Sequence, residues 1–250
     1  MSPPHGPEPS PEPSFNPSSR RRAAIFGVRQ ATGVPAIVLG ASFLGFGALV
    51  RQTDLTIWHG LLSTLTGWAL PGQVALIELY AVGASLVAIA AAVALTNARL
   101  LPMTITLMPL IRGPKVPRWQ YYLAAHLIAV TGWAAAMRDC PRLAVEERLP
   151  YFAGFASLLL TVSLAATALG YQLAGLVPAT VSLGLVFINP IYFMLLFAAD
   201  VRDAPRVLAL LLGALAGPLL HLVTPDWGLL LTGLIAGSLA FSLRGLLKRG

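Results

Sequence analysis

Long apolar segments separated by short polar connections make up most of the chain after residue 33. A helix needs about 20 apolar residues to cross a hydrocarbon core of ~30 Å. Eight segments are long enough, and the number is six or seven if a span has been miscounted. The pattern therefore predicts an all-α, polytopic integral membrane protein. The expected spans are Val34–Val50, Ile57–Val82, Gly83–Ile111, Trp119–Met137, Pro150–Gly170, Val177–Ala199, Arg206–Leu222 and Trp227–Leu243.

Two of these segments carry a proline near the middle of the span, Pro71 in the second and Pro190 in the sixth. Proline removes a backbone donor and clashes with the preceding turn, so we expect both helices to break. Asn189 is suited to cap the half-helix that starts at Pro190. Half-helices that face each other at such breaks form the substrate sites of secondary transporters. The alternative is that both prolines only kink the helices for packing.

A charged side chain lies in the third segment, which is long enough to suggest that it is bent or interrupted. Asn97 and Arg99 fall within roughly 10 Å of the depth of both proline breaks, at 1.5 Å of rise per residue. An arginine at the bilayer centre costs ~2.5–3.5 kcal/mol, so it normally faces a protein interior or a watery cavity. These residues predict a substrate site near the midplane, made of Pro71, Gly72, Gln73, Asn97, Arg99, Asn189 and Pro190.

Glu78 and His126 are the candidates for proton coupling. Glu78 is expected ~18 Å in depth from Arg99, too far for an ion pair. We place Glu78 in the cytoplasmic vestibule, with a carboxylate that snorkels to the interface as the alternative. His126 can titrate near neutral pH, but it can equally serve as a hydrogen-bonded contact between helices.

The organisation of the chain follows from its prolines. Pro35 and Pro150 each open the helix before a broken span, which predicts two similar repeats of equal orientation, approximately residues 29–137 and 147–243. Residues 1–19 are rich in proline and serine and lack apolar mass, so they predict a disordered cytoplasmic tail. The transporter domain is expected to occupy residues 20–250.

Composition narrows the class of protein. The chain is 56% hydrophobic and 11% charged, against about 25% charged residues in soluble domains. Its net charge of +7 comes from short basic clusters between apolar segments, as expected for loops on one side of a membrane rather than for nucleic-acid binding. With a cytoplasmic N-terminus, eight crossings leave four basic residues outside: Arg51, Arg112, Lys115 and Arg118.

The stretch from Gly67 to Pro102 resembles the AzlC family of branched-chain amino-acid permeases. The resemblance lies in Gly72-Gln73 after the mid-span break, in the Gly83-Ala84-Ser85 turn, and in Asn97 and Arg99. It implies export of branched-chain or similar apolar amino acids across the bacterial inner membrane, with a small AzlD-like membrane protein as second subunit. No cofactor or metal is expected.

Two alternatives belong to other classes. One is a permease or channel subunit for another small solute. The other is an intramembrane serine hydrolase, because Ser85 with His126 or His221 supplies a nucleophile and a base. The chain has no Gly-x-Ser-x-Gly elbow and no phosphate-binding loop. We therefore predict a transporter that is not an enzyme and that draws energy from a gradient or another polypeptide.

Overall fold

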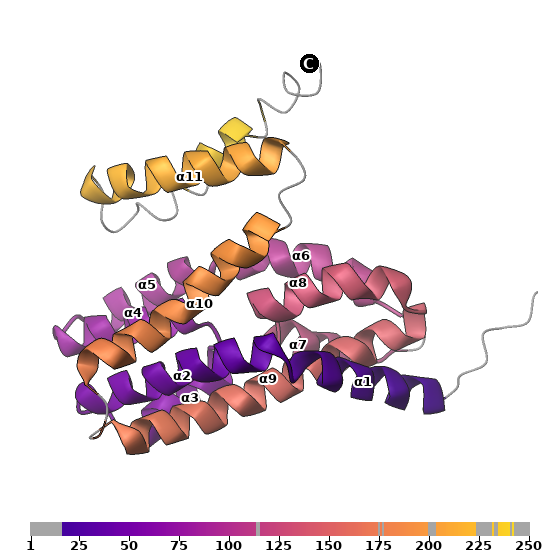
Figure 1. Cartoon of the computed structure of the whole chain (residues 1–250), viewed down its shortest axis with the longest axis horizontal. Helices are drawn as coiled ribbons and strands as arrows, with labels where there is room; N and C mark the ends of the chain where they lie inside the picture. Colours follow the sequence, from indigo (N-terminus) through magenta and orange to yellow (C-terminus); the bar gives the residue numbers. More distant parts are fainter. Residues whose placement is uncertain are drawn as a thin grey trace, which may run out of the picture.

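The computed structural model describes residues 17–113, 116–174, 176, 178–199 and 204–223, with a few positions between 232 and 242. The elements in this part are all helices (Figure 1), which confirms the all-α prediction there. Most of the predicted tail and of the eighth span lie outside the described residues. The helices are α1 Pro17–Ala31, α2 Val34–Gln52, α3 Ile57–Thr66, α4 Leu70–Ala81, α5 Leu86–Asn97, α6 Leu100–Ile111, α7 Arg118–His126, α8 Val130–Asp139, the short 3₁₀ helix η1 Cys140–Arg142, α9 Val145–Leu173, α10 Ala179–Ala199 and α11 Ala204–Val223.

The long helix α9 organises the bundle. Its 29 residues extend about 44 Å, and α1 and α2 follow one another along it, while α10 packs on α2 (Figure 1). Glycine makes the contact close: a Cβ at Gly27 would meet the backbone of Tyr151, and a Cβ at Gly47 that of Thr167. Small residues of this kind let helix backbones approach in membranes.

Two contacts within α2 fix its direction relative to α9: a Cβ at Gly40 would meet Val162, and a Cβ at Gly47 would meet Thr167. Residue numbers rise together along the interface, so α2 and α9 run parallel. This is the orientation expected for the helices assigned to Pro35 and Pro150. Pro35 does open α2, but the prediction that Pro150 opens its helix was wrong, because α9 begins at Val145 and Pro150 lies inside it. The larger prediction of two repeats stays a prediction, because most of the expected eighth span is outside the described residues.

Within the described residues, two helices, α2 and α9, are long and apolar enough to cross a membrane. A third crossing is formed if α5 and α6 count as one span, bent by 46° at Ala98 and Arg99. This bend confirms the interruption expected in Gly83–Ile111. The count of eight spans is not confirmed.

The segment Ile57–Val82 does not cross the bundle as predicted, but forms a hairpin of α3 and α4. Glu78 and Ala81, near the end of α4, line the same cavity as Gln52 and Thr53, which precede α3. At the turn, Gln73 Nε2 donates to Ser63 Oγ across the break. The two helices have 10 and 12 residues and extend only about 15 and 18 Å, so each reaches about halfway across the bundle before the chain turns back.

The segment Trp119–Met137 is likewise a hairpin, of α7 and α8. Arg148 at the start of α9 donates from Nη1 to Leu110 O near the end of α6, and from Nε to Leu143 O just after α8. Both ends of this hairpin therefore lie at the same end of the bundle. The two hairpins enter from opposite ends.

We call the end of the bundle at which α2 and α9 begin the N-terminal face, and the other end the opposite face. The α7–α8 hairpin starts and ends at the N-terminal face, so Arg112 and Arg118 lie there and not on the side predicted. Of the basic residues described before residue 178, only Arg51 lies at the opposite face. The basic residues of the N-terminal face are Arg20, Arg21, Arg22, Arg29, Arg112, Arg118, Arg138, Arg142 and Arg148.

The two proline breaks have different outcomes. α3 ends at Thr66 and α4 begins at Leu70, with Pro71 in its first turn, so the break before Pro71 is confirmed. The break expected at Pro190 was wrong, because α10 runs without interruption from Ala179 to Ala199. Proline within a membrane helix is tolerated where neighbouring groups satisfy the freed backbone.

Candidate functional site

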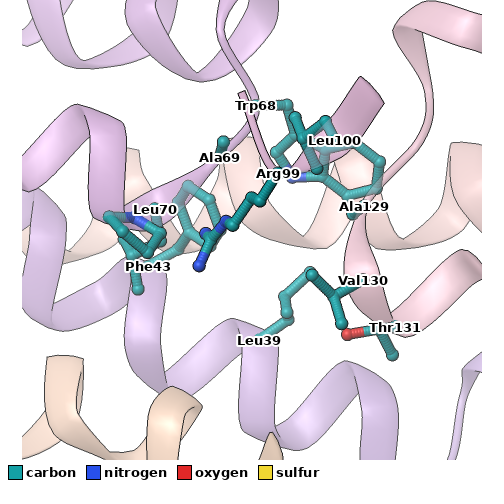
Figure 2. Close-up of a pocket in the computed structure, with 11 residues that line it drawn as sticks. Leu39, Phe43, Trp68, Ala69, Leu70, Arg99, Leu100, Ala129, Val130 and Thr131 are labelled. Carbon is teal, nitrogen blue, oxygen red and sulfur yellow. The ribbon is translucent and has the colours of Figure 1, made fainter. Parts of the chain in front are cut away.

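Three helix breaks meet at a small central cavity. It has a volume of about 30 Å³ and lies between the α3–α4, α5–α6 and α7–α8 breaks, with α2 as its remaining wall (Figure 2). We call it the central cavity. Its lining residues are Leu39, Phe43, Trp68, Ala69, Leu70, Pro71, Arg99, Leu100, Ala129, Val130 and Thr131.

Arg99 is the charged residue of this lining. Figure 2 shows its side chain extending from the α5–α6 break toward Leu70 and Phe43. No described residue gives the guanidinium a hydrogen bond or an ion pair. A guanidinium offers five N–H donors in a planar fork that matches a carboxylate. Arg99 is therefore free to bind an anion in the cavity.

Two helix N-termini border the same cavity. α4 begins after Ala69 and α8 begins after Ala129, and neither N-cap residue makes a side-chain capping bond. The first N–H groups of a helix have no partner within the helix and carry positive partial charge, which favours anions. With Arg99, they make the centre of the bundle an anion-binding environment.

The α7–α8 break and Thr131 were not predicted. The break covers Leu127 to Ala129 and contains no proline. His126 Nε2 lies 2.7 Å from Leu65 O, so the C-terminal ends of α7 and α3 are joined. Because Leu65 O can only accept, the imidazole donates. This contact favours the role of His126 as a link between helices.

Gln73 is held near the turn of the α3–α4 hairpin. Its Nε2 donates to Ser63 Oγ at 3.1 Å and to Thr64 Oγ1 at 3.0 Å. Both hydroxyls donate their own protons to Gly60 O, so both must accept from the amide. Gln73 Oε1 is consequently fixed as an acceptor, and it is buried without a partner.

Asn97 packs against α4 at Gly72. A Cβ at Gly72 would lie 2.6 Å from Asn97 Oδ1, so the amide keeps this position only with glycine at residue 72. Asn97 Oδ1 is buried without a hydrogen-bond partner, and so is Thr131 Oγ1 in the cavity wall. An unsatisfied buried group costs about 1–3 kcal/mol. Gln73 Oε1, Asn97 Oδ1 and Thr131 Oγ1 are thus three buried oxygens that receive no hydrogen bond, and of these three residues Thr131 lines the central cavity.

The structure thus brings together most of the predicted site residues. Pro71 and Arg99 line the central cavity, and Gly72 and Asn97 touch each other beside it. α10, which contains Asn189 and Pro190, contributes nothing to the described lining, and the side chains of those two residues lie outside the described part.

Glu78 lies in a different cavity, at the opposite face. This outer cavity has a volume of about 200 Å³ and is formed by α2, α4 and Leu183 of α10. Glu78 had been placed on the side of the N-terminus, and the hairpin reverses that placement. No ion pair joins Glu78 to Arg99 in the described structure, as expected from their difference in depth.

Ser85 acts as a helix cap. Its Oγ accepts a hydrogen bond from the backbone N–H of Ala88 at 3.3 Å, at the start of α5. His126 is engaged with Leu65 O, and the side chain of His221 is outside the described part. The described residues therefore contain no serine–histidine pair at Ser85.

A membrane-embedded helical bundle with facing half-helices around a buried anion-binding centre is typical of transport proteins. The family model described as AzlC protein matches residues 35–177, which is more than half of the chain and spans α2 to α9. The chain belongs to the AzlC family, which indicates a membrane permease for amino acids. No curated protein and no solved structure matches the chain significantly.

Proposed function

We propose that this protein is a secondary transporter that exports branched-chain or similar apolar amino acids through the central cavity. The observation that carries the proposal is the unpaired Arg99 beside two uncapped helix N-termini. An amino-acid carboxylate would bind the guanidinium in a bidentate manner. The ammonium group would donate to oxygens among Thr131 Oγ1, Asn97 Oδ1 and Gln73 Oε1.

The apolar part of such a substrate would contact Leu39, Phe43 and Leu100. At about 30 Å³ the cavity has room for about two water molecules and is too small for an amino acid. Substrate entry therefore requires the two hairpins to separate. Their tips are joined by the His126 contact with Leu65 O, so we expect this bond to break in the loaded state.

The charge distribution supports an orientation in the bacterial inner membrane. Cytoplasmic loops carry an excess of arginine and lysine. Of the eleven arginines and lysines described before residue 178, nine lie at the N-terminal face, Arg51 lies at the opposite face, and Arg99 lies between the two. We therefore place this face, with the N-terminus, in the cytoplasm. Export then runs from the N-terminal face to the opposite face.

A small AzlD-like membrane protein is part of the proposal. α5 and α6 leave large apolar side chains exposed, with Leu86 81% and Leu101 65% accessible. This side of the Arg99 break faces either lipid or a second subunit. We propose that the small subunit covers it, so that efflux requires both chains.

The test is efflux of preloaded labelled leucine, isoleucine, valine and methionine from cells that express this chain, with and without a small AzlD-like partner. Hydrogen bonds to charged groups contribute about 1.5–3 kcal/mol, so Arg99→Gln should slow efflux about tenfold or more. Arg118→Gln, which removes an exposed arginine of the N-terminal face, is the matched control. Normal efflux by Arg99→Gln in inserted protein would refute the assignment.

A permease for another small anion is the second candidate, because the guanidinium and helix N-termini recognise a carboxylate whatever its side chain. Labelled short-chain carboxylates without an amino group distinguish the two. If they leave the cell through the wild-type protein and the four amino acids do not, the transported solute is an anion rather than a zwitterion.

A further inference from the structure

The outer cavity at the opposite face has the shape of a small-ligand site. Leu49 of α2, Ile77 of α4 and Leu183 of α10 give it apolar walls. Its polar groups are Gln52, Thr53 and Glu78. A mostly apolar cavity with a few polar groups at one side is the usual form of a site for a small organic molecule.

The polar side of the outer cavity favours a cation. No described residue forms an ion pair or hydrogen bond with the Glu78 carboxylate. Arg51 precedes Gln52 in the sequence, but its guanidinium lies 4.9 Å from the centre of the Tyr171 ring and is not paired with Glu78. The Thr53 hydroxyl donates within α2, to Val50 O at 3.0 Å. The carboxylate therefore retains its full capacity to accept hydrogen bonds from a ligand.

The size of the cavity limits the ligand. An engineered cavity of about 150 Å³ accommodates benzene, which has six non-hydrogen atoms. By proportion, a cavity of about 200 Å³ accommodates roughly eight such atoms. Isopentylamine, with six, fits completely. Leucine, with nine, fits if its carboxylate stays at the exposed rim beside Gln52.

We propose that the outer cavity binds the ammonium group of a small apolar amine or amino acid through Glu78, with the aliphatic part between α2 and α4. Glu78 follows Pro71 by seven residues along α4, about 10 Å toward the opposite face. A substrate that leaves the central cavity along α4 reaches Glu78 next. Its role as an exit site rests on the proposed transport function, whereas the binding of amines does not.

The experiment is isothermal titration of the purified full chain with isopentylamine, with leucine, and with 4-methylpentanoate, which keeps the side chain and carboxylate of leucine but lacks the amine. We expect isopentylamine to bind the wild-type protein. Glu78→Gln should weaken this binding about tenfold or more. Glu146→Gln, on the N-terminal face, should leave it unchanged. Ala81→Leu, which fills the cavity without a change of charge, should also weaken it.

The outcomes separate this proposal from the transport function. Equal binding of isopentylamine by the wild type and by Glu78→Gln overturns the outer site. The absence of binding to the wild type also overturns it, and that result is expected if the Glu78 carboxylate only snorkels toward lipid headgroups. Isopentylamine binding that depends on Glu78, in a protein whose leucine efflux does not depend on Arg99, would support the outer site and reject the central one.

Discussion

Gly72→Ala is the substitution that should reduce leucine efflux while leaving the thermal stability of the protein almost unchanged. The added Cβ would lie 2.6 Å from Oδ1, 2.8 Å from Nδ2 and 3.0 Å from Cγ of Asn97. An ordinary contact needs at least about 3.4 Å, so Oδ1 must move by roughly 0.8 Å, which is about 20° of rotation within the Asn97 side chain. A side chain about 30° off its rotamer costs about 0.5–1.5 kcal/mol.

The change in overall stability should nevertheless be small. Alanine restricts the unfolded chain more than glycine and gains about 0.5–1 kcal/mol within a helix. The two terms nearly cancel, so we expect the melting temperature of Gly72→Ala to stay close to that of the wild type. Because the displaced amide adjoins the Arg99 break, leucine efflux should fall about tenfold.

Two other glycines provide the controls. A Cβ at Gly184 has no atom within 4 Å, so Gly184→Ala should leave efflux unchanged. A Cβ at Gly47 meets the backbone of Thr167, which cannot rotate away. Gly47→Ala should therefore force α2 from α9 and destabilise the protein by about 1–3 kcal/mol or more.

The assays are efflux in cells and thermal unfolding of purified protein. The reasoning about Asn97 is refuted if Gly72→Ala behaves like Gly184→Ala in both. It is also refuted if Gly72→Ala unfolds as readily as Gly47→Ala, since the clash would then involve more than a side chain.

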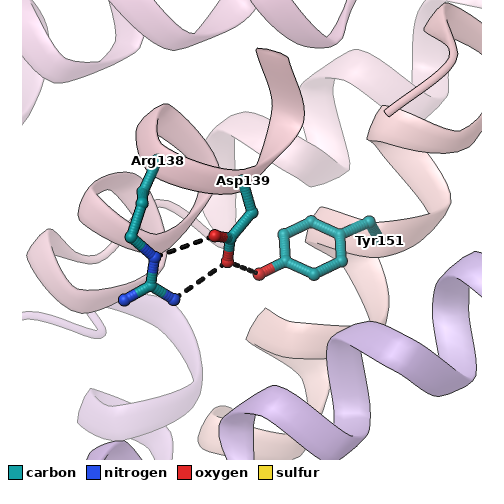
Figure 3. Close-up of polar contacts among 3 residues, drawn as sticks. All are labelled: Arg138, Asp139 and Tyr151. Atoms are coloured by element: carbon teal, nitrogen blue, oxygen red, sulfur yellow. Dashed lines mark hydrogen bonds and ion pairs between the residues drawn. The ribbon is translucent and has the colours of Figure 1, made fainter. Parts of the chain in front are cut away.

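Three further predictions concern the N-terminal face. Burial raises the pKa of the Cys140 thiol to about 11, so maleimide at pH 7.5 should modify Cys140 in denatured but not in native protein; equal labelling would contradict its burial. Partial burial alone would raise the pKa of Asp139, but hydrogen bonds from Arg138 and Tyr151 and the charge of Arg138 lower it below its usual value (Figure 3). The ionised Asp139 therefore stabilises the fold at pH values above its unfolded-state pKa of ~3.9. The melting temperature of Asp139→Asn should lie below that of the wild type at pH 7, and the two should converge as the pH falls below ~4. A difference in melting temperature that persists at low pH would contradict this. Because Cys140 is unreactive, Arg118→Cys provides a single reporter of sidedness: the hairpin predicts labelling from the side of the N-terminus, and labelling from the other side would support eight crossings.

The helix breaks illustrate what could be predicted from the sequence. Pro71 marks a true break because Gly67 precedes it and α3 is already ending there. Pro190 lies in an equally apolar segment, yet α10 passes through it, since the cost of one lost hydrogen bond depends on neighbouring helices that a local pattern does not reveal. The α7–α8 break has no proline at all, and the polar residues that flank it in the sequence are His126 and Thr131.

The direction of each segment was harder to predict than its helical character. A hairpin of two short helices and one membrane span have the same length and hydropathy, so Ile57–Val82 fits either description. The deciding observation is tertiary: Glu78 and Ala81 at the end of the segment line the same cavity as Gln52 and Thr53 just before its start. The charges did contain a signal, because placing Arg112 and Arg118 at the N-terminal face removes two of the four exceptions to the cytoplasmic bias of basic residues.

Arg99 was predicted to face the interior because an unpaired charge in an apolar segment is costly wherever the helix lies, and it lines the central cavity. Its neighbours could not all be predicted, because they come from three breaks that converge only in the folded chain. Thr131 is such a neighbour. Glu78 was assigned to the wrong face for the same reason that its helix was taken to cross the membrane.

The most direct test of the central claim is an experimental structure of the protein with leucine bound. We predict density for the leucine carboxylate within hydrogen-bonding distance of the Arg99 guanidinium, between the N-termini of α4 and α8, with a cavity enlarged from its present volume of about 30 Å³. Leucine bound elsewhere, with Arg99 unliganded, would contradict the account.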